Sequence, residues 1–226
     1  MSIEIKKCAV LGAGVMGAQI AGHIANAGIP SLLFDINEEL AQKGVDGLSK
    51  LKPAPLFSSS NKALVTPCTY DNDLEKLSDC DLIIEAVAEK IEIKHAVYKN
   101  LLPHLKKGVI LASNTSGIPL ANLVEVLPED IQKSFLIAHF FNPPRYLKLL
   151  ELVKGEKTSE QVYETMTEFG ETTLGKGIVH AKDTPGFIGN RLINAGGPLT
   201  YHKAVEMGLT VEDVDALSGT LVGNAK

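Results

Sequence analysis

We predict an α/β fold in which a doubly wound, Rossmann-type parallel sheet is followed by a short, incomplete all-α segment. Three observations support this prediction. A glycine-rich turn joins an apolar strand, 8–11, to a helical stretch, 15–27. Apolar strands then alternate with helical stretches as far as residue 181, which is typical of a parallel sheet. From residue 187 on, only helical patterns follow, with no strand between them.

The glycine-rich turn has the spacing G-x-G-x-x-G, at Gly12, Gly14 and Gly17. In dinucleotide-binding folds the first glycine allows a tight turn and the second lets a pyrophosphate approach the backbone, while the third lets the helix pack closely on the sheet. The helix that starts here offers free N–H groups and the positive end of its dipole to a phosphate. Because the strand 8–11 and the helix 15–27 flank the motif as this fold requires, we predict a dinucleotide site.

The second strand, 31–35, ends on Asp35, eighteen residues beyond Gly17. That separation is close to the one expected for the acid that binds the ribose hydroxyls. An NADP phosphate about 5 Å from this carboxylate would be repelled by roughly 3 kcal/mol at an effective dielectric constant of 20. No arginine follows in 36–39 to offset the repulsion, so we predict NAD as the cofactor. The predicted cofactor-binding residues of this region are Gly12, Gly14, Val15, Met16, Gly17 and Asp35.

The remaining elements follow from their hydropathy patterns and from the residues that break them. Pro53 and Pro55 stop the helix 38–51, because proline breaks the hydrogen-bond ladder and restricts the residue before it. The near-continuous apolar run 81–87 is typical of a strand that is covered on both faces. We predict further strands at 64–70, 108–112, 135–138, 148–153 and 177–181, and helices at 74–77, 89–105, 159–169, 187–207 and 211–217.

Pro185 and Gly186 interrupt the chain where alternating strands and helices give way to helices alone. We therefore predict a domain boundary here, with an NAD-binding domain at 1–184 and the start of a helical domain at 185–226. About forty residues are too few to bury much hydrophobic core alone.

The composition excludes several functional classes. The 226 residues carry a net charge of −5 and the lysines are scattered, so we do not expect a nucleic-acid surface. No apolar run approaches membrane-spanning length, and the N-terminus lacks an apolar signal core. The three cysteines are odd in number and form no C-x-x-C pair, which favours reduced thiols in the cytoplasm. The histidines show no metal-ligand spacing, so we predict no metal site.

His139, at the end of a predicted strand, is the first candidate for chemistry. Glu151 follows twelve residues later in another strand, and it can reach the imidazole if the two strands are neighbours. A carboxylate on one ring nitrogen fixes the tautomer and leaves the other nitrogen as a base. A lone strand-end histidine is more often structural, so both interpretations stay open here. Ser116 and Asn190 lie beside predicted turns, where they can either hydrogen-bond a substrate oxygen or cap a helix.

Five short motifs stand in order along the chain: GAGVMG at 12–17, IEAVAE at 84–89, SNTS at 113–116, HFFNP at 139–143 and DTPGFIGNR at 183–191. Together they resemble the L-3-hydroxyacyl-CoA dehydrogenase family of fatty-acid β-oxidation, and the resemblance covers essentially the whole chain. Segments 143–151 and 52–55 resemble the long bacterial members, which carry a fused enoyl-CoA hydratase-like region.

The resemblance implies NAD-dependent oxidation of an L-3-hydroxyacyl-CoA, with acyl-CoA as the substrate class. It implies that His139 is the general base for the 3-hydroxyl proton and that Glu151 orients it. It also implies that Ser116 and Asn190 position the substrate's oxygens. The chemistry agrees, because the hydroxyl proton must go to a base within hydrogen-bond reach as hydride leaves C3. The residues that correspond to positions near the nicotinamide and its ribose are Glu89, Lys94 and Asn142.

The chain departs from the family in two places. The segment after the second strand is shorter than the helical hairpin that holds CoA in the stand-alone enzymes, which leaves the CoA contacts open. The chain also ends soon after the family's helical domain begins, so we interpret it as a truncated or split product. A homodimer through the helical segment is one expectation. Two alternatives to the enzyme stay open, namely a non-catalytic NAD-binding fragment that needs a partner chain, and a dehydrogenase for free hydroxy acids.

Overall fold

The computed structural model describes residues 3–218. Contacts divide the chain into two compact units, Met1–Pro185 and Gly186–Lys226. The first unit contains the sheet, and the second contains the last two described helices. The assignment of 1–184 and 185–226 to an NAD-binding domain and a helical domain stays a prediction.

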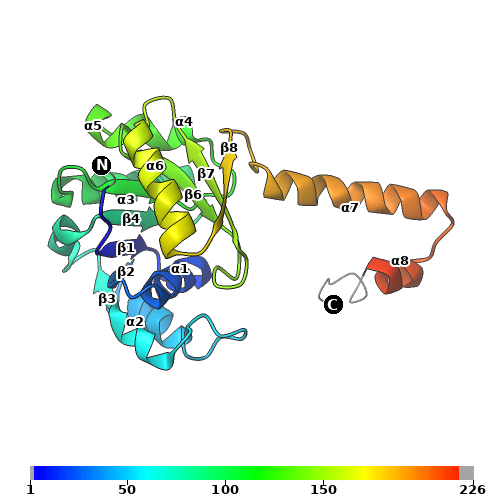
Figure 1. Cartoon of the computed structure of the whole chain (residues 1–226), viewed down its shortest axis with the longest axis horizontal. Coiled ribbons are helices and arrows are strands. Elements are labelled where there is room, and N and C mark those ends of the chain that lie inside the picture. Colours follow the sequence, from blue (N-terminus) through cyan, green and yellow to red (C-terminus); the bar gives the residue numbers. More distant parts are fainter. Residues whose placement is uncertain (1–2, 219–226) are drawn as a thin grey trace. The chain divides into compact units, whose positions relative to one another are not determined.

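The described part of the first unit forms one eight-stranded sheet in the order β3-β2-β1-β4-β5-β6-β7-β8 (Figure 1). The chain starts at β1, inside the sheet, and winds outward from it in two directions, as the doubly wound fold predicts. The strands are β1 (Cys8–Leu11), β2 (Ser31–Asp35), β3 (Val65–Thr69), β4 (Leu82–Glu85), β5 (Ile110–Ser113), β6 (Phe135–Phe140), β7 (Leu149–Lys154) and β8 (Gly177–Ala181).

Strand β7 runs antiparallel to β6, whereas the other neighbouring strands of the sheet are parallel. The sequence analysis expected a parallel sheet, so it was wrong at this one pairing. A parallel connection needs a crossover of a dozen or more residues. Only 141–148 separate β6 from β7, so the chain turns back and the two strands pair side by side.

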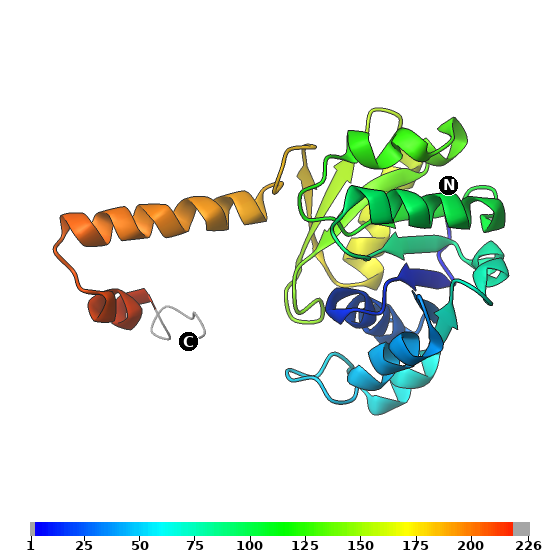
Figure 2. The ribbon, with the colours of Figure 1, turned by 180° about the vertical axis from the view of Figure 1, so that it is seen from behind.

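Helices cover both faces of the sheet (Figures 1 and 2). On one face, buried side chains of α1 (Val15–Asn26), α2 (Glu38–Gly47) and α6 (Glu160–Glu168) form a hydrophobic core with alternate strand residues such as Cys8 and Val10. Burial of these apolar side chains is the main force that holds α1, and with it the glycine-rich turn, against the sheet.

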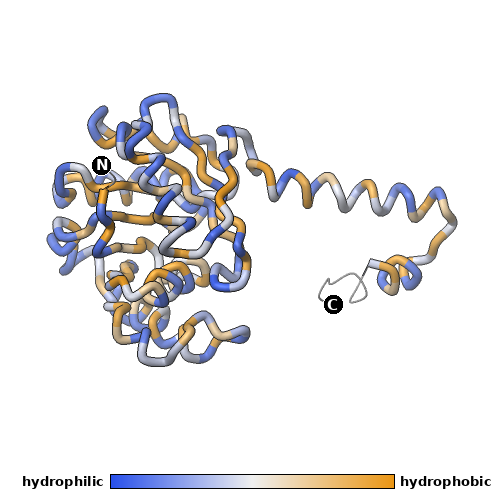
Figure 3. The backbone as a smooth tube through the Cα atoms, in the orientation of Figure 1, coloured by the Kyte–Doolittle hydropathy of each residue, from blue (hydrophilic) through white to orange (hydrophobic). Residues whose placement is uncertain are grey.

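The opposite face is covered by α3 (Ile91–Leu101), which lies in front of the sheet in Figure 2. Its Tyr98 is fully buried and meets the ring of Phe135 in β6 edge-on, with 5.9 Å between the ring centres. Strand residues that alternate with those of the first core, such as Ala9 and Leu11, are also fully buried. The central strands are therefore covered on both faces, and Figure 3 shows them as hydrophobic stretches.

Some predicted elements have different ends in the structure. The helix predicted at 38–51 ends at Gly47, before the prolines that were expected to stop it. The strand predicted at 135–138 continues to Phe140 because it pairs with β7, so His139 lies within the strand. Short connecting elements are α4 (Leu120–Leu123), α5 (Glu129–Gln132), the 3-10 helices Ser59–Leu64, Leu74–Asp79, Leu102–His104 and Val124–Val126, and the π-helical turn Phe169–Thr173.

The second unit contains α7 (Gly189–Glu206) and α8 (Val211–Ser218). Large apolar side chains on these helices are exposed, among them Leu192, Val205 and Val211. Figure 3 shows hydrophobic and hydrophilic residues interleaved along α7. In the range 3–218, no helix is both long and apolar enough to cross a membrane.

Candidate functional site

The glycine-rich turn connects β1 to α1, and the structure gives Gly12 and Gly17 a steric reason. Gly12 has a positive φ of 99°, and a Cβ there would lie 2.7 Å from the carbonyl oxygen of Ala86. A Cβ on Gly17 would lie 1.8 Å from the carbonyl oxygen of Gly12, so only glycine lets the helix start so close to the turn. At Gly14 nothing lies within 4 Å of the added atom. The turn is thus closed on the protein side and open at its middle glycine, where a pyrophosphate would approach.

Asp35 lies against this turn at the end of β2. Its carboxylate accepts hydrogen bonds from the N–H of Ala13 and the N–H of Ile36, both at 2.7 Å. Val15, at the start of α1, is 61% exposed, and the first N–H groups of a helix have no acceptor within the helix. This arrangement fits NAD, with the phosphates at the helix start and the ribose hydroxyls at Asp35. Of the other predicted contacts in the turn, Met16 is partly buried.

His139 and Glu151 stand directly opposite each other on the antiparallel strands β6 and β7. The His139 Nδ1 atom is 2.7 Å from the Glu151 carboxylate. His139 is 3% exposed and Glu151 is fully buried. A carboxylate can only accept, so Nδ1 donates to it, and in the neutral ring this leaves the lone pair on Nε2.

Ser116 brings a hydroxyl to that second nitrogen. Its Oγ lies 3.1 Å from the His139 Nε2 atom and donates to it in this tautomer. The ring of His139 also lies beside that of Phe141, with 4.6 Å between the centres. The structure therefore brings together three of the predicted catalytic residues, and the line Glu151–His139–Ser116 is suited to taking a proton from a hydroxyl group.

Glu89 holds the loop that carries Ser116. Its Oε1 atom accepts hydrogen bonds from the Thr115 hydroxyl at 2.5 Å, the Ser116 N–H at 2.9 Å and the Gly117 N–H at 3.2 Å. Lys94 Nζ lies 3.3 Å from the other carboxylate oxygen, and Lys94 is only 1% exposed. Burial raises the pKa of Glu89, but the Thr115 hydrogen bond and the Lys94 charge outweigh it and leave the pKa below its usual value.

Asn142 and Asn190 are the remaining predicted site residues. Asn142 accepts a hydrogen bond from Gln19 of α1 at 3.0 Å, so it sits beside the helix that starts at the glycine-rich turn. Asn190 lies in the first turn of α7, in the second unit, and its role stays a prediction. The sequence analysis assigned no role to Thr115 or Gln19. The signal for Thr115 was its place in the SNTS motif, directly after a buried strand.

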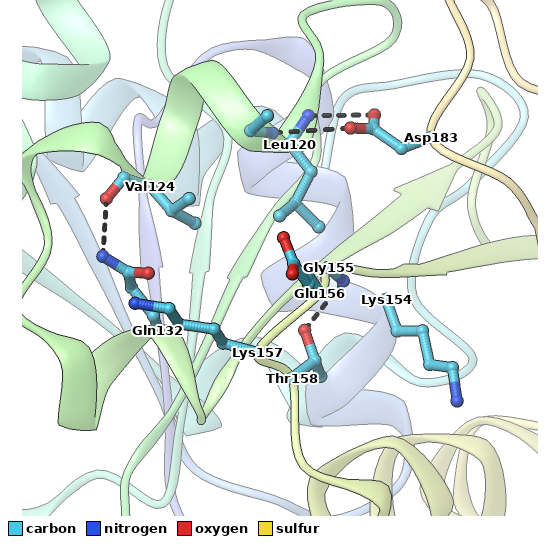
Figure 4. Close-up of a pocket in the computed structure, with 10 residues that line it drawn as sticks. Leu120, Val124, Gln132, Lys154, Gly155, Glu156, Lys157, Thr158 and Asp183 are labelled. Atoms are coloured by element: carbon cyan, nitrogen blue, oxygen red, sulfur yellow. Dashed lines mark hydrogen bonds between the residues drawn. The ribbon is translucent and has the colours of Figure 1, made fainter.

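A cavity of about 290 Å³ lies near the last residue of β7, Lys154 (Figure 4). His139 and Glu151 are not among its lining residues. Asp183, from the fifth motif, accepts from the Leu120 N–H at 2.9 Å and so fixes the start of α4. Within residues 3–218, no group of three His, Cys, Asp or Glu side chains is arranged to hold a metal ion. We assign this cavity no role in the chemistry.

Comparison with known proteins finds a family model that matches most of the chain. Residues 7–184 match the family model described as 3-hydroxyacyl-CoA dehydrogenase, NAD binding domain. A probable 3-hydroxyacyl-CoA dehydrogenase of Deinococcus radiodurans is 44% identical over 99% of this chain and 66% of its own length. One of Bacillus subtilis is 42% identical over 100% of this chain and 31% of its own. The crystal structure of (S)-3-hydroxybutyryl-CoA dehydrogenase from Ralstonia eutropha superposes with a TM-score of 0.80 and 28% identity, over 92% of this chain and 75% of that one.

The chain thus spans about a third of one curated relative and just under two thirds of the other. The matched region contains every predicted site residue except Asn190.

Proposed function

We propose that this chain, which belongs to the 3-hydroxyacyl-CoA dehydrogenase family and matches the family's NAD-binding-domain model over residues 7–184, oxidises L-3-hydroxyacyl-CoA to 3-ketoacyl-CoA in fatty-acid β-oxidation. The observation that carries the proposal is the contact pattern of His139. One ring nitrogen faces a buried carboxylate, and the other faces a hydroxyl that a substrate alcohol can replace or join.

In this proposal the His139 Nε2 atom takes the proton of the 3-hydroxyl group. The Glu151 carboxylate holds the ring in the required tautomer and stabilises the imidazolium that forms, because opposite charges interact strongly in a buried site. Ser116 positions the substrate oxygen beside Nε2, and Asn190 is assigned a second contact to the substrate's oxygens. NAD, when bound, accepts the hydride from C3.

The chain's own residues would hold the cofactor at three places. Gly12, Gly14 and the start of α1 meet the pyrophosphate, and Asp35 meets the adenosine ribose. Residues near the nicotinamide and its ribose are Glu89, Lys94 and Asn142. Since Lys94 is almost fully buried, we assign it a contact with Glu89 before any contact with the cofactor.

Two alternatives are kept. A non-catalytic fragment that needs a partner chain is supported by the exposed apolar side chains of α7 and α8, which also support a homodimer through these helices. A dehydrogenase for free hydroxy acids would use the same His139 and Glu151, because the acid–base chemistry is the same. The three cysteines are buried free thiols, which supports a reducing compartment such as the cytoplasm.

The test is NADH oxidation by this chain with acetoacetyl-CoA, acetoacetate or no substrate. Turnover with acetoacetyl-CoA alone supports the proposal, and a preference for acetoacetate supports the free-acid alternative. NADH binding without turnover on either compound contradicts an active enzyme and supports the partner-dependent fragment. NADPH in place of NADH should give much slower turnover, because its phosphate would lie near Asp35.

A further inference from the structure

We infer that Glu85, the last residue of β4, is a positioning residue that keeps Ser116 in place at His139 through Lys94 and Glu89. The inference rests on the proposed function, in which Ser116 orients the substrate. Glu85 lies inside the IEAVAE motif, but neither the proposed mechanism nor the proposed cofactor contacts use it. It is fully buried, at the end of a strand whose other residues, Leu82, Ile83 and Ile84, are apolar.

The Glu85 carboxylate is fully occupied by protein donors. Its Oε1 atom accepts from Lys94 Nζ at 2.6 Å and from the Val87 N–H at 2.9 Å. Its Oε2 atom accepts from the Tyr98 hydroxyl at 2.8 Å and the Ser113 hydroxyl at 2.7 Å. Four donors from β5, α3 and the chain after β4 therefore meet at one carboxylate, which fixes these segments relative to one another.

Two routes lead from Glu85 to Ser116. In the first, the Lys94 ammonium is shared between Glu85 and Glu89, and Glu89 accepts the Ser116 N–H. In the second, the Ser113 hydroxyl that donates to Glu85 accepts the Thr115 N–H at 3.2 Å, one residue before Ser116. Both routes end on the backbone that carries the Ser116 hydroxyl to His139.

The charges of Glu85, Lys94 and Glu89 determine how a change at Glu85 would reach Ser116. Two carboxylates share one buried ammonium, and the shorter contact, 2.6 Å against 3.3 Å, goes to Glu85. If Glu85 lost its charge, the Lys94 ammonium would be attracted to Glu89 alone. Glu89 would then turn toward Lys94 and weaken its bonds to the N–H groups of Ser116 and Gly117.

A purely structural role is the competing explanation. A loss of stability does not decide between the two roles, because removing one partner of a buried ion pair destabilises the fold in either case. Glu85→Gln keeps the size and removes the charge. Tyr98→Phe is the matched control, because it removes one donor from Oε2 and leaves both Lys94 contacts intact.

The first experiment measures acetoacetyl-CoA reduction with NADH and with NADH deuterated at C4. For Glu85→Gln we expect kcat to fall about tenfold or more, with KM for NADH within about twofold and a larger isotope effect, because misplaced groups slow the chemical step. Tyr98→Phe should keep both kcat and the isotope effect within about twofold of the parent. A lower kcat with an unchanged isotope effect in Glu85→Gln would mean only fewer folded molecules and would overturn the inference.

The second experiment does not need turnover, so it separates this inference from the proposed function. Amide hydrogen exchange should speed up about tenfold or more at Ser116 and Gly117 in Glu85→Gln and stay unchanged there in Tyr98→Phe. Equal exchange at these amides in all three proteins would overturn the inference even if the parent protein is active. If Glu85→Gln does not fold, the double variant Glu85→Gln/Lys94→Met leaves no unpaired ammonium. Because the Lys94 link between Glu85 and Glu89 is missing in this variant, exchange at Ser116 and Gly117 should again be faster than in the parent, and parental exchange in it would also overturn the inference.

Discussion

The glycine-rich turn and the His139 cluster are built in different ways, although both belong to one sheet. In the turn, contacts run through backbone atoms, and the key property of Gly12 and Gly17 is the absence of a side chain. In the cluster, the contacts of His139 run between side chains, and both His139 and Glu151 are almost completely buried. The turn is therefore sensitive to added volume, whereas the cluster is sensitive to lost charge and lost hydrogen bonds.

This difference separates binding from chemistry. A backbone turn with an open middle glycine can meet the cofactor's phosphates through local backbone atoms. The cluster needs β5, β6 and β7 to place Ser116, His139 and Glu151 within hydrogen-bond distance. Changes in the cluster should lower turnover and spare NADH binding, and changes in the turn should do the reverse.

The largest expected effect comes from removing the base. In His139→Gln, turnover with acetoacetyl-CoA should fall about a thousandfold, because no group is left to exchange the proton. The Kd for NADH, measured by fluorescence titration, should stay within about twofold, because the glycine-rich turn is intact. A large loss of NADH binding in this variant would break the separation of the two regions.

The matched pair Gly17→Ala and Gly14→Ala tests the turn. In Gly17→Ala the new Cβ would lie 1.8 Å from a backbone oxygen, so we expect a loss of about 2–4 kcal/mol in the free energy of unfolding. Gly14→Ala has open space and should change this free energy by less than about 0.5 kcal/mol. It should nevertheless weaken NADH binding about tenfold or more, because its methyl group occupies the pyrophosphate approach. Urea unfolding and NADH titration of both variants give the answer, and normal NADH affinity in Gly14→Ala would refute our placement of the pyrophosphate.

Asp35→Ala tests the side-chain carboxylate that lies against the turn. It should weaken NADH binding about tenfold to a hundredfold, the usual range for a lost hydrogen bond to a charged group. The preference for NADH over NADPH should also relax, since the repelling carboxylate is gone. Titration with both cofactors measures this, and an unchanged preference would remove the basis for choosing NAD over NADP by charge.

The last expected effect is on stability, and it concerns the helix behind the turn. His23 of α1 is bonded to the Leu174 carbonyl oxygen, and burial, together with the Lys176 charge, lowers its pKa to about 4. In the unfolded chain this histidine takes up a proton near pH 6.5, so the folded state loses stability as the pH falls below 6.5 toward 4. Between pH 7 and 5 the loss amounts to roughly 2 kcal/mol.

His23→Gln should remove this part of the pH dependence of the free energy of unfolding. Urea unfolding of the parent protein and of the variant at each pH measures the difference. The other titrating groups are common to both proteins and cancel in the difference. Parallel stability curves from pH 7 to 5 would show that His23 is not the group responsible.

The turn could be predicted from sequence because its information is local. Gly12 to Gly17 span six residues, and Asp35 follows after one helix and one strand. In the structure the Asp35 carboxylate accepts the Ala13 N–H and so lies against the turn, whereas its predicted contact with the ribose stays a prediction.

The cluster could be predicted only in part, because its geometry depends on strand pairing. The approach of Glu151 to His139 required neighbouring strands, and the antiparallel direction of β7 was not foreseen. The burial of Lys94 was also not foreseen, because a lysine in a helical pattern is usually solvated. The signal that pointed to Glu85 was available, namely a carboxylate at the end of an otherwise apolar strand.

In our proposal the buried Glu151 carboxylate makes His139 a working base in an NAD-dependent dehydrogenase. The most direct test compares NADH oxidation with acetoacetyl-CoA by the parent chain and by Glu151→Gln, with NADH affinity measured on both. We predict turnover in the parent chain, a loss of about a hundredfold or more in the variant and equal NADH affinity. The reason is that the uncharged amide neither holds the His139 ring in the required tautomer nor stabilises the imidazolium. Equal turnover in both proteins would contradict the account.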